Sequence, residues 1–169
     1  MRNRNCFLHL LLMGLAVVGA ASAQRLTTNQ QATPILHAAG FGPFYPCLPD
    51  GYRFHVDDGD IQQDIRYGVT TNEDWVVLIA KLRILTPQEA QHPEQLLPAL
   101  QAANPHHRSS RFQIDREDHR ENGYVRTEAW LSLWVGIENG KVTPDSTRAA
   151  VAGIFDTIRA TQFIVWRER

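Results

Sequence analysis

The 169-residue chain lacks several features that define common protein classes. It holds only two cysteines, and its 17 basic residues are balanced by 18 acidic ones. Nucleic-acid binders usually show a basic excess, so this balance argues against that class. Two cysteines are too few for a disulfide framework, and a hydrophobic content of 43% is too high for a disordered tail. These absences leave a globular protein that depends on its apolar core.

Motifs with catalytic or metal-binding chemistry are also scarce. The chain has no Gly-rich phosphate loop, no H-E-x-x-H and no C-x-x-C. His106–His107 has no Cys, Asp or Glu at a helical ligand spacing, and Asp57–Asp60 lacks the closing Glu of a calcium loop. Ser109–Ser110 is not part of a nucleophile elbow. We therefore predict no catalytic residue, no metal site and no cofactor. An enzyme that assembles its groups across the fold is the alternative.

The N-terminus has the three parts of a secretory signal. Arg2 and Arg4 precede an almost continuous apolar run over 7–20, which ends in Ala21-Ser22-Ala23. We predict cleavage before Gln24, a periplasmic or secreted protein, and no membrane insertion after cleavage. Cys6 precedes the apolar run, where it cannot be the lipidated cysteine of a lipoprotein. The remaining 146 residues keep one cysteine, Cys47, which we interpret as a small buried apolar side chain.

Periodicity predicts a single α+β domain over 34–169, preceded by a flexible segment over 24–33. The expected elements are a helix near 28–39 that starts close to Pro34, a loop over 42–51, strands over 52–56, 61–69 and 75–85, an irregular helix over 86–103 kinked at Pro98, a strand over 111–115, a charged turn over 115–123, a strand over 124–137 and a helix capped by Thr143. This order, α-β-β-β-α-β-β-α, predicts helices packed on a mainly antiparallel five-stranded sheet.

The strand over 124–137 carries the strongest candidate site. Its odd positions are small or aliphatic, whereas Trp130 and Trp134 share the even face with Ser132 between them. The same face carries Tyr124, Arg126 and Glu128, so at least one end of it meets water. Two interpretations stay open: a helix covers both indole rings as core, or the rings form a partner-binding surface with that polar edge. Trp75 and Trp166 are candidates for the same neighbourhood.

The stretch from 75 to 160 resembles the YbjN-type family of bacterial sensory-transduction regulators, whose fold is similar to type III secretion chaperones. The resemblance rests on Leu96-Leu97-Pro98-Ala99-Leu100-Gln101-Ala102-Ala103-Asn104, on Phe112-Gln113-Ile114-Asp115, on the strand over 124–135 and on the Thr143-Pro144 helix start. It implies a non-enzymatic protein-binding module that often dimerises, and no catalytic residue comes with it. The export signal departs from the cytoplasmic setting of secretion chaperones.

Together these observations predict an exported, non-enzymatic protein-binding module, chaperone-like or regulatory, that uses an aromatic sheet face. Its expected partner is another protein, with a homodimer possible and nucleic acid excluded. One alternative is a periplasmic immunity or inhibitor protein directed against an envelope-acting enzyme. Another is a small-ligand carrier or a hydrolase with a site between sheet and helices.

Overall fold

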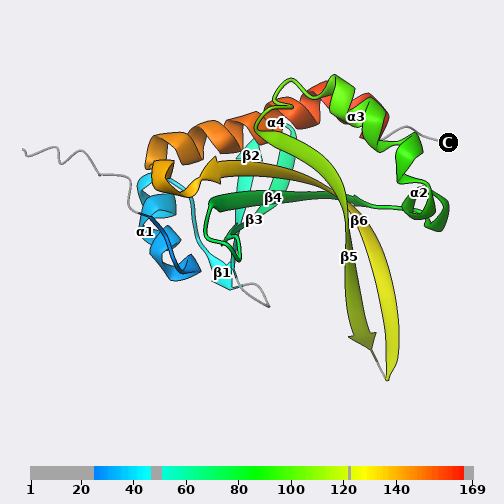
Figure 1. Cartoon of the computed structure of the whole chain (residues 1–169), viewed down its shortest axis with the longest axis horizontal. Helices are drawn as coiled ribbons and strands as arrows, with labels where there is room; N and C mark the ends of the chain where they lie inside the picture. The colour runs from blue at the N-terminus through cyan, green and yellow to red at the C-terminus, as the bar shows by residue number, and fades with distance from the viewer. Residues whose placement is uncertain (1–24, 47–50, 122, 166–169) are drawn as a thin grey trace, which may run out of the picture.

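A curled antiparallel sheet with helices on one of its faces forms the body of the protein (Figure 1). The computed structural model describes residues 25–46, 51–121 and 123–165. The expected signal segment over 1–23, together with Cys47 and Trp166, lies outside the described residues. The α+β class predicted from the sequence is confirmed.

The sheet contains six strands, one more than predicted. In spatial order they are β1 (Tyr45–Pro46), β2 (Tyr52–Asp58), β3 (Ile61–Val69), β4 (Trp75–Ile84), β6 (Tyr124–Glu138) and β5 (Ser110–Glu121), and every neighbouring pair is antiparallel. The additional strand, β1, lies in the stretch predicted as a loop. It pairs with Tyr52 and Arg53 over two residues, which is too short for an alternating pattern to reveal.

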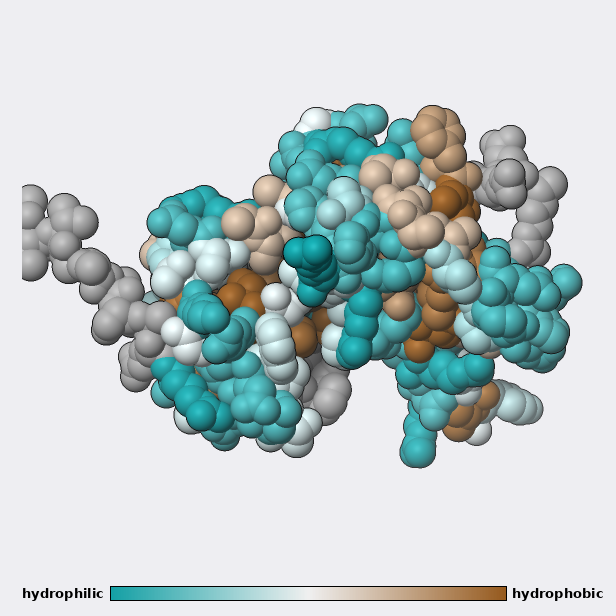
Figure 2. Space-filling model, turned by 45° about the horizontal axis from the view of Figure 1, so that its top comes forward, coloured by the Kyte–Doolittle hydropathy of each residue, from teal (hydrophilic) through white to brown (hydrophobic). Residues whose placement is uncertain are grey.

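The helices are α1 (Asn29–Ala38), α2 (Pro87–Gln91), α3 (Leu97–Ala103) and α4 (Pro144–Val165), with 3₁₀ turns η1 (Pro93–Gln95) and η2 (Asn139–Lys141). α4 runs across the sheet, with α1 near its first turn and α3 beside its far end (Figure 1). Fully buried side chains fill the layer between helices and sheet: Phe54, Ile65, Tyr67, Leu78, Leu100, Leu131, Leu133, Ile154 and Phe155. When the helical side is turned forward, hydrophilic residues cover most of the surface (Figure 2).

α4 matches its sequence pattern closely. The Thr143 hydroxyl accepts a hydrogen bond from the Ser146 amide at 3.1 Å, as expected of an N-cap residue. The predicted apolar stripe of α4 is buried against the sheet and comprises Val151, Ile154, Phe155 and Ile158. None of the helices in the described part of the chain is long and apolar enough to cross a membrane.

The other two helical regions differ from the prediction in detail. α1 begins at Asn29, five residues before Pro34, and Leu26 just ahead of it is 2% exposed. The segment predicted as flexible therefore includes a helical turn and a buried leucine. The region over 86–103 is broken at His92 and η1, and Pro98 lies in the first turn of α3 instead of kinking a longer helix.

The stretch over 115–121, predicted as a charged turn, is the second half of a strand. β5 continues to Glu121 and pairs with β6 along its whole length, so the hairpin turns between Glu121 and Tyr124. Its polar and charged residues pair across the two strands; the Thr127 hydroxyl, for example, donates to Asp118 Oδ1 at 2.6 Å, and His119 Nε2 lies 3.4 Å from Glu128 Oε2. We call the part of this hairpin beyond Asp115 and Trp130 the arm; it projects away from the sheet (Figure 1).

Candidate functional site

One face of the sheet carries no helix from the described part of the chain, and the candidate site lies on it. We call this the open face, and define it by the side chains that alternate with the core residues of β2 to β6. It includes Arg53, His55, Asp64, Arg66, Trp75, Val77, Ile79, Lys81, Arg111, Gln113, Asp115, Glu117, Trp130, Ser132, Trp134 and Gly136. Trp130 and Trp134 are half-buried there by neighbouring strands, and the hollows that they line contain no helix residue.

The two indole rings of β6 are each held by side chains of adjacent strands. The Trp134 Nε1–H donates to Asp115 Oδ2 at 3.0 Å, and the Arg111 guanidinium lies over the Trp134 ring at 5.8 Å from its centroid. The Lys81 ammonium lies 4.9 Å from the centroid of the Trp130 ring. Such cation–π contacts favour a fixed ring orientation. Both tryptophans are therefore held in place at the surface before any partner arrives.

Trp75 joins this face from the first position of β4 and is 48% exposed. The Thr70 hydroxyl accepts from the Trp75 amide at 3.1 Å and donates to the Trp75 carbonyl at 3.0 Å, which fixes the backbone of that residue. The ring lies over Gly136, where an added Cβ would be only 3.2 Å from Trp75 Cε3. Glycine at this position leaves room for the indole ring.

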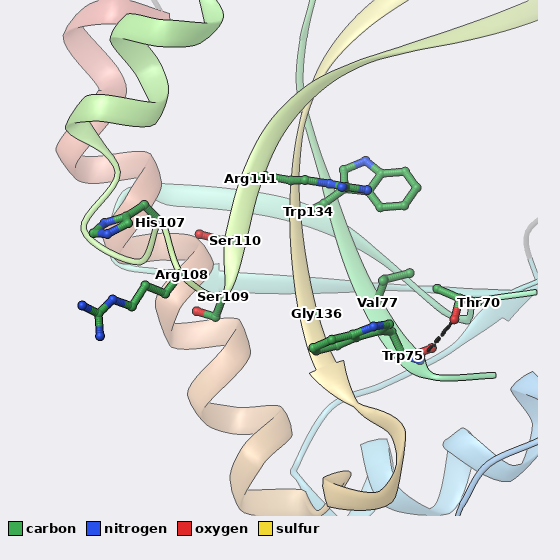
Figure 3. Close-up of a pocket in the computed structure, with 10 residues that line it drawn as sticks. All are labelled: Thr70, Trp75, Val77, His107, Arg108, Ser109, Ser110, Arg111, Trp134 and Gly136. Carbon is green, nitrogen blue, oxygen red and sulfur yellow. Dashed lines mark hydrogen bonds between the residues drawn. The ribbon is translucent and has the colours of Figure 1, made fainter. Parts of the chain in front are cut away.

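Trp75 and Trp134 form two walls of a hollow of about 310 Å³, which we call the aromatic pocket (Figure 3). Val77 and Gly136 lie between the two rings, and the loop over 107–110 closes one side. The Gly136 amide donates to the Ser109 carbonyl at 3.1 Å, which ties that loop to β6. In Figure 3, His107 and Arg108 point away from the rings, whereas Arg111 extends along Trp134.

A second hollow, of about 320 Å³, lies on the open face where the arm begins, and Trp130 forms one of its walls. Its charges are closely paired. Glu117 Oε1 accepts from Arg66 Nη1 at 2.8 Å, and Glu117 Oε2 forms an ion pair with Lys81 Nζ. Burial alone would raise the pKa of Glu117. The Lys81 hydrogen bond and the charges of Arg66 and Lys81 outweigh that effect and lower it.

The three polar residues predicted with the tryptophans lie farther out, on the arm. Tyr124 is 81% exposed at the end of the hairpin, six residues from Trp130, or about 20 Å along an extended strand. Glu128 receives ion pairs from Arg126 at 3.3 Å and from His119 at 3.4 Å. The structure therefore brings Trp134 together with Trp75 at one hollow and places Trp130 on the same face at the other hollow, and it does not bring Tyr124 to them.

Sequence reasoning anticipated Trp75 and missed Arg111 and Gly136. Phe112 and Ile114 share one face of their strand, so a two-residue period places Arg111 on the opposite face of that strand. The same reasoning assigned Trp134 to a face of its own strand. That signal was present in the sequence. Which faces of two distant strands coincide depends on register, and the register Arg111↔Trp134 follows from the length of the hairpin.

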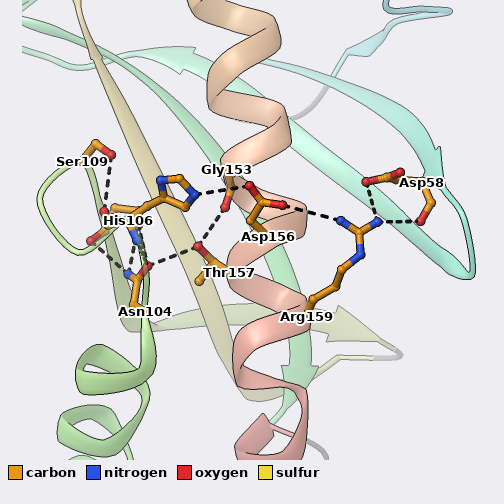
Figure 4. Close-up of polar contacts among 9 residues, drawn as sticks. Asp58, Asn104, His106, Ser109, Gly153, Asp156, Thr157 and Arg159 are labelled. Carbon is orange, nitrogen blue, oxygen red and sulfur yellow. Dashed lines mark hydrogen bonds and ion pairs between the residues drawn. The ribbon is translucent and has the colours of Figure 1, made fainter.

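His, Asp and Ser, the residue types of a catalytic triad, occur together near the loop over 104–109, beside α4 (Figure 4). His106 Nε2 lies 3.4 Å from Asp156 Oδ2, but the Ser109 hydroxyl donates to the His106 backbone carbonyl at 3.3 Å and not to its ring. Asn104 is buried and links the loop to α4 through the Thr157 hydroxyl at 3.2 Å. This cluster has no nucleophile–base contact, and its hydrogen bonds attach the loop to the helix.

Across residues 25–46, 51–121 and 123–165, no group of three or more His, Cys, Asp and Glu side chains is arranged to hold a metal ion. Comparison with known proteins finds no family model, no curated protein and no solved structure that matches this chain. The resemblance to the YbjN-type family stays a prediction from sequence.

Proposed function

We propose that this chain is a non-enzymatic protein-binding module, chaperone-like or regulatory, whose recognition surface is the open face between Trp75 and Trp130. One observation carries the proposal: three indole rings lie on the one sheet face that the helices leave uncovered. Tryptophan and arginine are enriched at the energetic centres of protein interfaces, and this face presents both. The arm extends the surface with exposed Tyr124 and with Arg126 and Glu128 at its edge.

Rigidity also supports a recognition role. Thr70 fixes the backbone of Trp75 and the Trp75 ring packs over Gly136, while Asp115 and Arg111 hold the Trp134 ring, so ordering these side chains costs little entropy when a partner binds. An exported protein with such a face would meet its partner in the periplasm or outside the cell. A regulator and an inhibitor of an envelope enzyme both use a surface of this kind, and the affinity for a single partner distinguishes them.

The proposal can be tested by comparative capture from cell-envelope extract. The baits are the purified protein, the variants Trp75→Ala and Trp134→Ala, and the control Phe163→Ala. Phe163 is a suitable control because it is 79% exposed on α4, away from the open face. Circular dichroism and urea unfolding establish that each bait is folded. Trp75→Ala keeps the test valid if Trp134→Ala proves unstable, because the Trp75 ring is half-exposed.

A binding partner on this face is retained by the parent and by Phe163→Ala and is lost by both tryptophan variants. Proteins retained equally by all folded baits, or lost with Phe163→Ala alone, would contradict the proposal. A partner that binds one-to-one and is released only under denaturing conditions would favour the inhibitor role. Several weakly held partners would favour the chaperone-like or regulatory one.

A further inference from the structure

Among the basic groups of the open face, Arg111 has a distinct environment. Arg53, Arg66, Lys81 and Arg126 each form an ion pair with an Asp or Glu side chain. Arg111 has no carboxylate partner in the described part of the chain, and its guanidinium lies over the Trp134 ring. The Arg111 side chain is exposed, at the second residue of the edge strand β5. The positive charge is therefore available to an outside carboxylate.

The aromatic pocket beside Arg111 is small. Its volume of about 310 Å³ lies at the lower limit for small-molecule sites, which usually enclose most of a drug-sized ligand. Its walls are indole rings, and Val77 and Gly136 lie between them. No Asp or Glu among the described residues lines it. An apolar side chain can pack between the rings without meeting a negative charge.

From this charge complementarity we infer that the aromatic pocket binds a segment of a partner protein that presents an aromatic side chain next to a carboxylate. The aromatic group packs between Trp75 and Trp134, and the adjacent Asp or Glu pairs with the Arg111 guanidinium. The inference rests on the proposed function and specifies its partner chemistry. It assigns binding to the aromatic pocket alone, and the paired charges around Glu117 take no part in it.

The test uses three synthetic peptides that differ at one position each: acetyl-Gly-Phe-Asp-Gly-amide, the same peptide with Asn for Asp, and the same peptide with Ala for Phe. Binding is followed in ¹⁵N-resolved NMR spectra through the indole N–H signals of Trp75 and Trp134. The Phe-Asp peptide should bind in the millimolar range, and the Asn peptide about three- to fivefold more weakly, because it lacks the exposed ion pair. The Ala peptide should produce no saturable shift.

The variants Arg111→Gln and Arg120→Gln show whether Arg111 is responsible. Arg120 is the matched control because it is an exposed arginine of the same strand, on the opposite face. Arg111→Gln should abolish the discrimination between the Asp and Asn peptides, and Arg120→Gln should preserve it. Raising the salt concentration should weaken only the Asp peptide.

Equal binding of the Asp and Asn peptides to the parent protein would overturn the assignment to Arg111. Absence of any saturable shift at the two indole signals would overturn the assignment of the aromatic pocket as the binding site. If benzoate binds as tightly as the Phe-Asp peptide, the occupant is a small aromatic acid and the inference is wrong. If the indole signals shift on dilution without peptide, the occupant is a second copy of this chain, and the inference is also wrong. If the peptides fail while the tryptophan variants still lose a captured protein, the proposed function stands and this inference is wrong.

Discussion

Arg66 of β3 donates a hydrogen bond to Glu117 of β5 at 2.8 Å, although β4 and β6 lie between these two strands. In a flat sheet, three strand spacings place the two backbones about 14 Å apart. The sheet curls (Figure 1), which brings β5 towards β3 across the open face, and the Arg66 and Glu117 side chains span the remaining distance. The base of the arm is thus tied to the sheet by charge as well as by backbone pairing.

Replacing Glu117 by Gln should therefore reduce the free energy of unfolding. The substitution leaves Arg66 and Lys81, both partly buried, without their shared carboxylate, and a loss of about 1–2 kcal/mol is expected. Urea unfolding at neutral pH measures it. Glu138→Gln is the control, because the ion pair of Glu138 with Lys141 is exposed to solvent; its effect should stay within about 0.5 kcal/mol.

The same variant has a predicted pH dependence. The pKa of Glu117 is lower in the folded protein than its ordinary value of 4.5, so its stabilisation is fully present above that value. It is lost as pH falls through the folded pKa, where the carboxyl group gains a proton. The difference in unfolding free energy between parent and Glu117→Gln should shrink below about pH 4.5. A difference that grows on acidification would contradict the assignment.

His55 should titrate above its ordinary range. Its Nδ1 lies 2.9 Å from Asp64 Oδ1 and its Nε2 lies 3.0 Å from Asp57 Oδ1. The hydrogen bond to Asp64 is the main cause that raises the pKa of His55 above 6.5; slight burial opposes it, and Asp57 adds to it. The stabilising contribution is complete below pH 6.5 and disappears as pH rises through the folded pKa.

An NMR titration of the His55 ring protons measures this pKa directly. In the parent protein the midpoint should lie above 6.5, and Asp64→Asn should bring it closer to that value. A His55 midpoint that Asp64→Asn leaves unchanged would show that the two side chains do not interact in solution.

Asn139 should be one of the most sensitive positions of the fold. Its side chain is 2% exposed, accepts from the Leu26 amide at 2.7 Å, and donates to the Leu26 and Glu73 carbonyls at 2.7 and 2.6 Å. It joins the N-terminal segment to the turn between β3 and β4. Asn139→Ala leaves these three backbone groups without hydrogen-bond partners. We therefore expect the free energy of unfolding to fall by about 2–4 kcal/mol.

Urea unfolding and hydrogen exchange together check this prediction. The Leu26 amide should exchange much faster in Asn139→Ala than in the parent, since it loses its acceptor. Asn72→Ala is the control: Asn72 bonds to exposed groups of the same turn, and a loss below about 1 kcal/mol is expected. Equal effects of the two substitutions would show that burial at Asn139 adds nothing.

Local patterns predicted the parts of this fold that depend on local chemistry. The stripe of α4, its Thr143 cap and the turn between β2 and β3 follow from periodicity and turn composition. The stretch over 115–121 was predicted as a turn because a run of charges usually marks solvent. Its charges instead pair across β5 and β6 and reach Arg66 and Lys81, which depends on the curl of the sheet. No local pattern reports that curl.

The candidate site also has a part that local periodicity predicts and a part that depends on three-dimensional packing. That Trp130 and Trp134 share a face follows from a period of two, whereas the location of the helices on the other face depends on how α4 crosses the sheet. The position of Trp75 over Gly136 likewise depends on the register of β4 and β6, because Val77 is opposite Gly136. Periodicity predicts which side chains share a face of one strand, and the register between strands determines which side chains of different strands are in contact.

Ser132 provides a test of packing on the open face itself. It lies between Trp130 and Trp134 on β6, is 0% exposed, and its hydroxyl has no hydrogen-bond partner in the described residues. A buried hydroxyl without a partner destabilises the fold. Ser132→Ala should therefore leave the free energy of unfolding unchanged or raise it by up to about 1 kcal/mol.

Ser110→Ala is the matched control, because Ser110 is also a buried strand serine but its hydroxyl is hydrogen-bonded. It donates to the His106 carbonyl at 2.9 Å and accepts from Asn104 Nδ2 at 3.0 Å. A loss of about 1–2 kcal/mol is expected there. If Ser132→Ala costs as much as Ser110→Ala in urea unfolding, then the Ser132 hydroxyl has a hydrogen-bond partner in solution, and the space between Trp130 and Trp134 is packed differently from the structure.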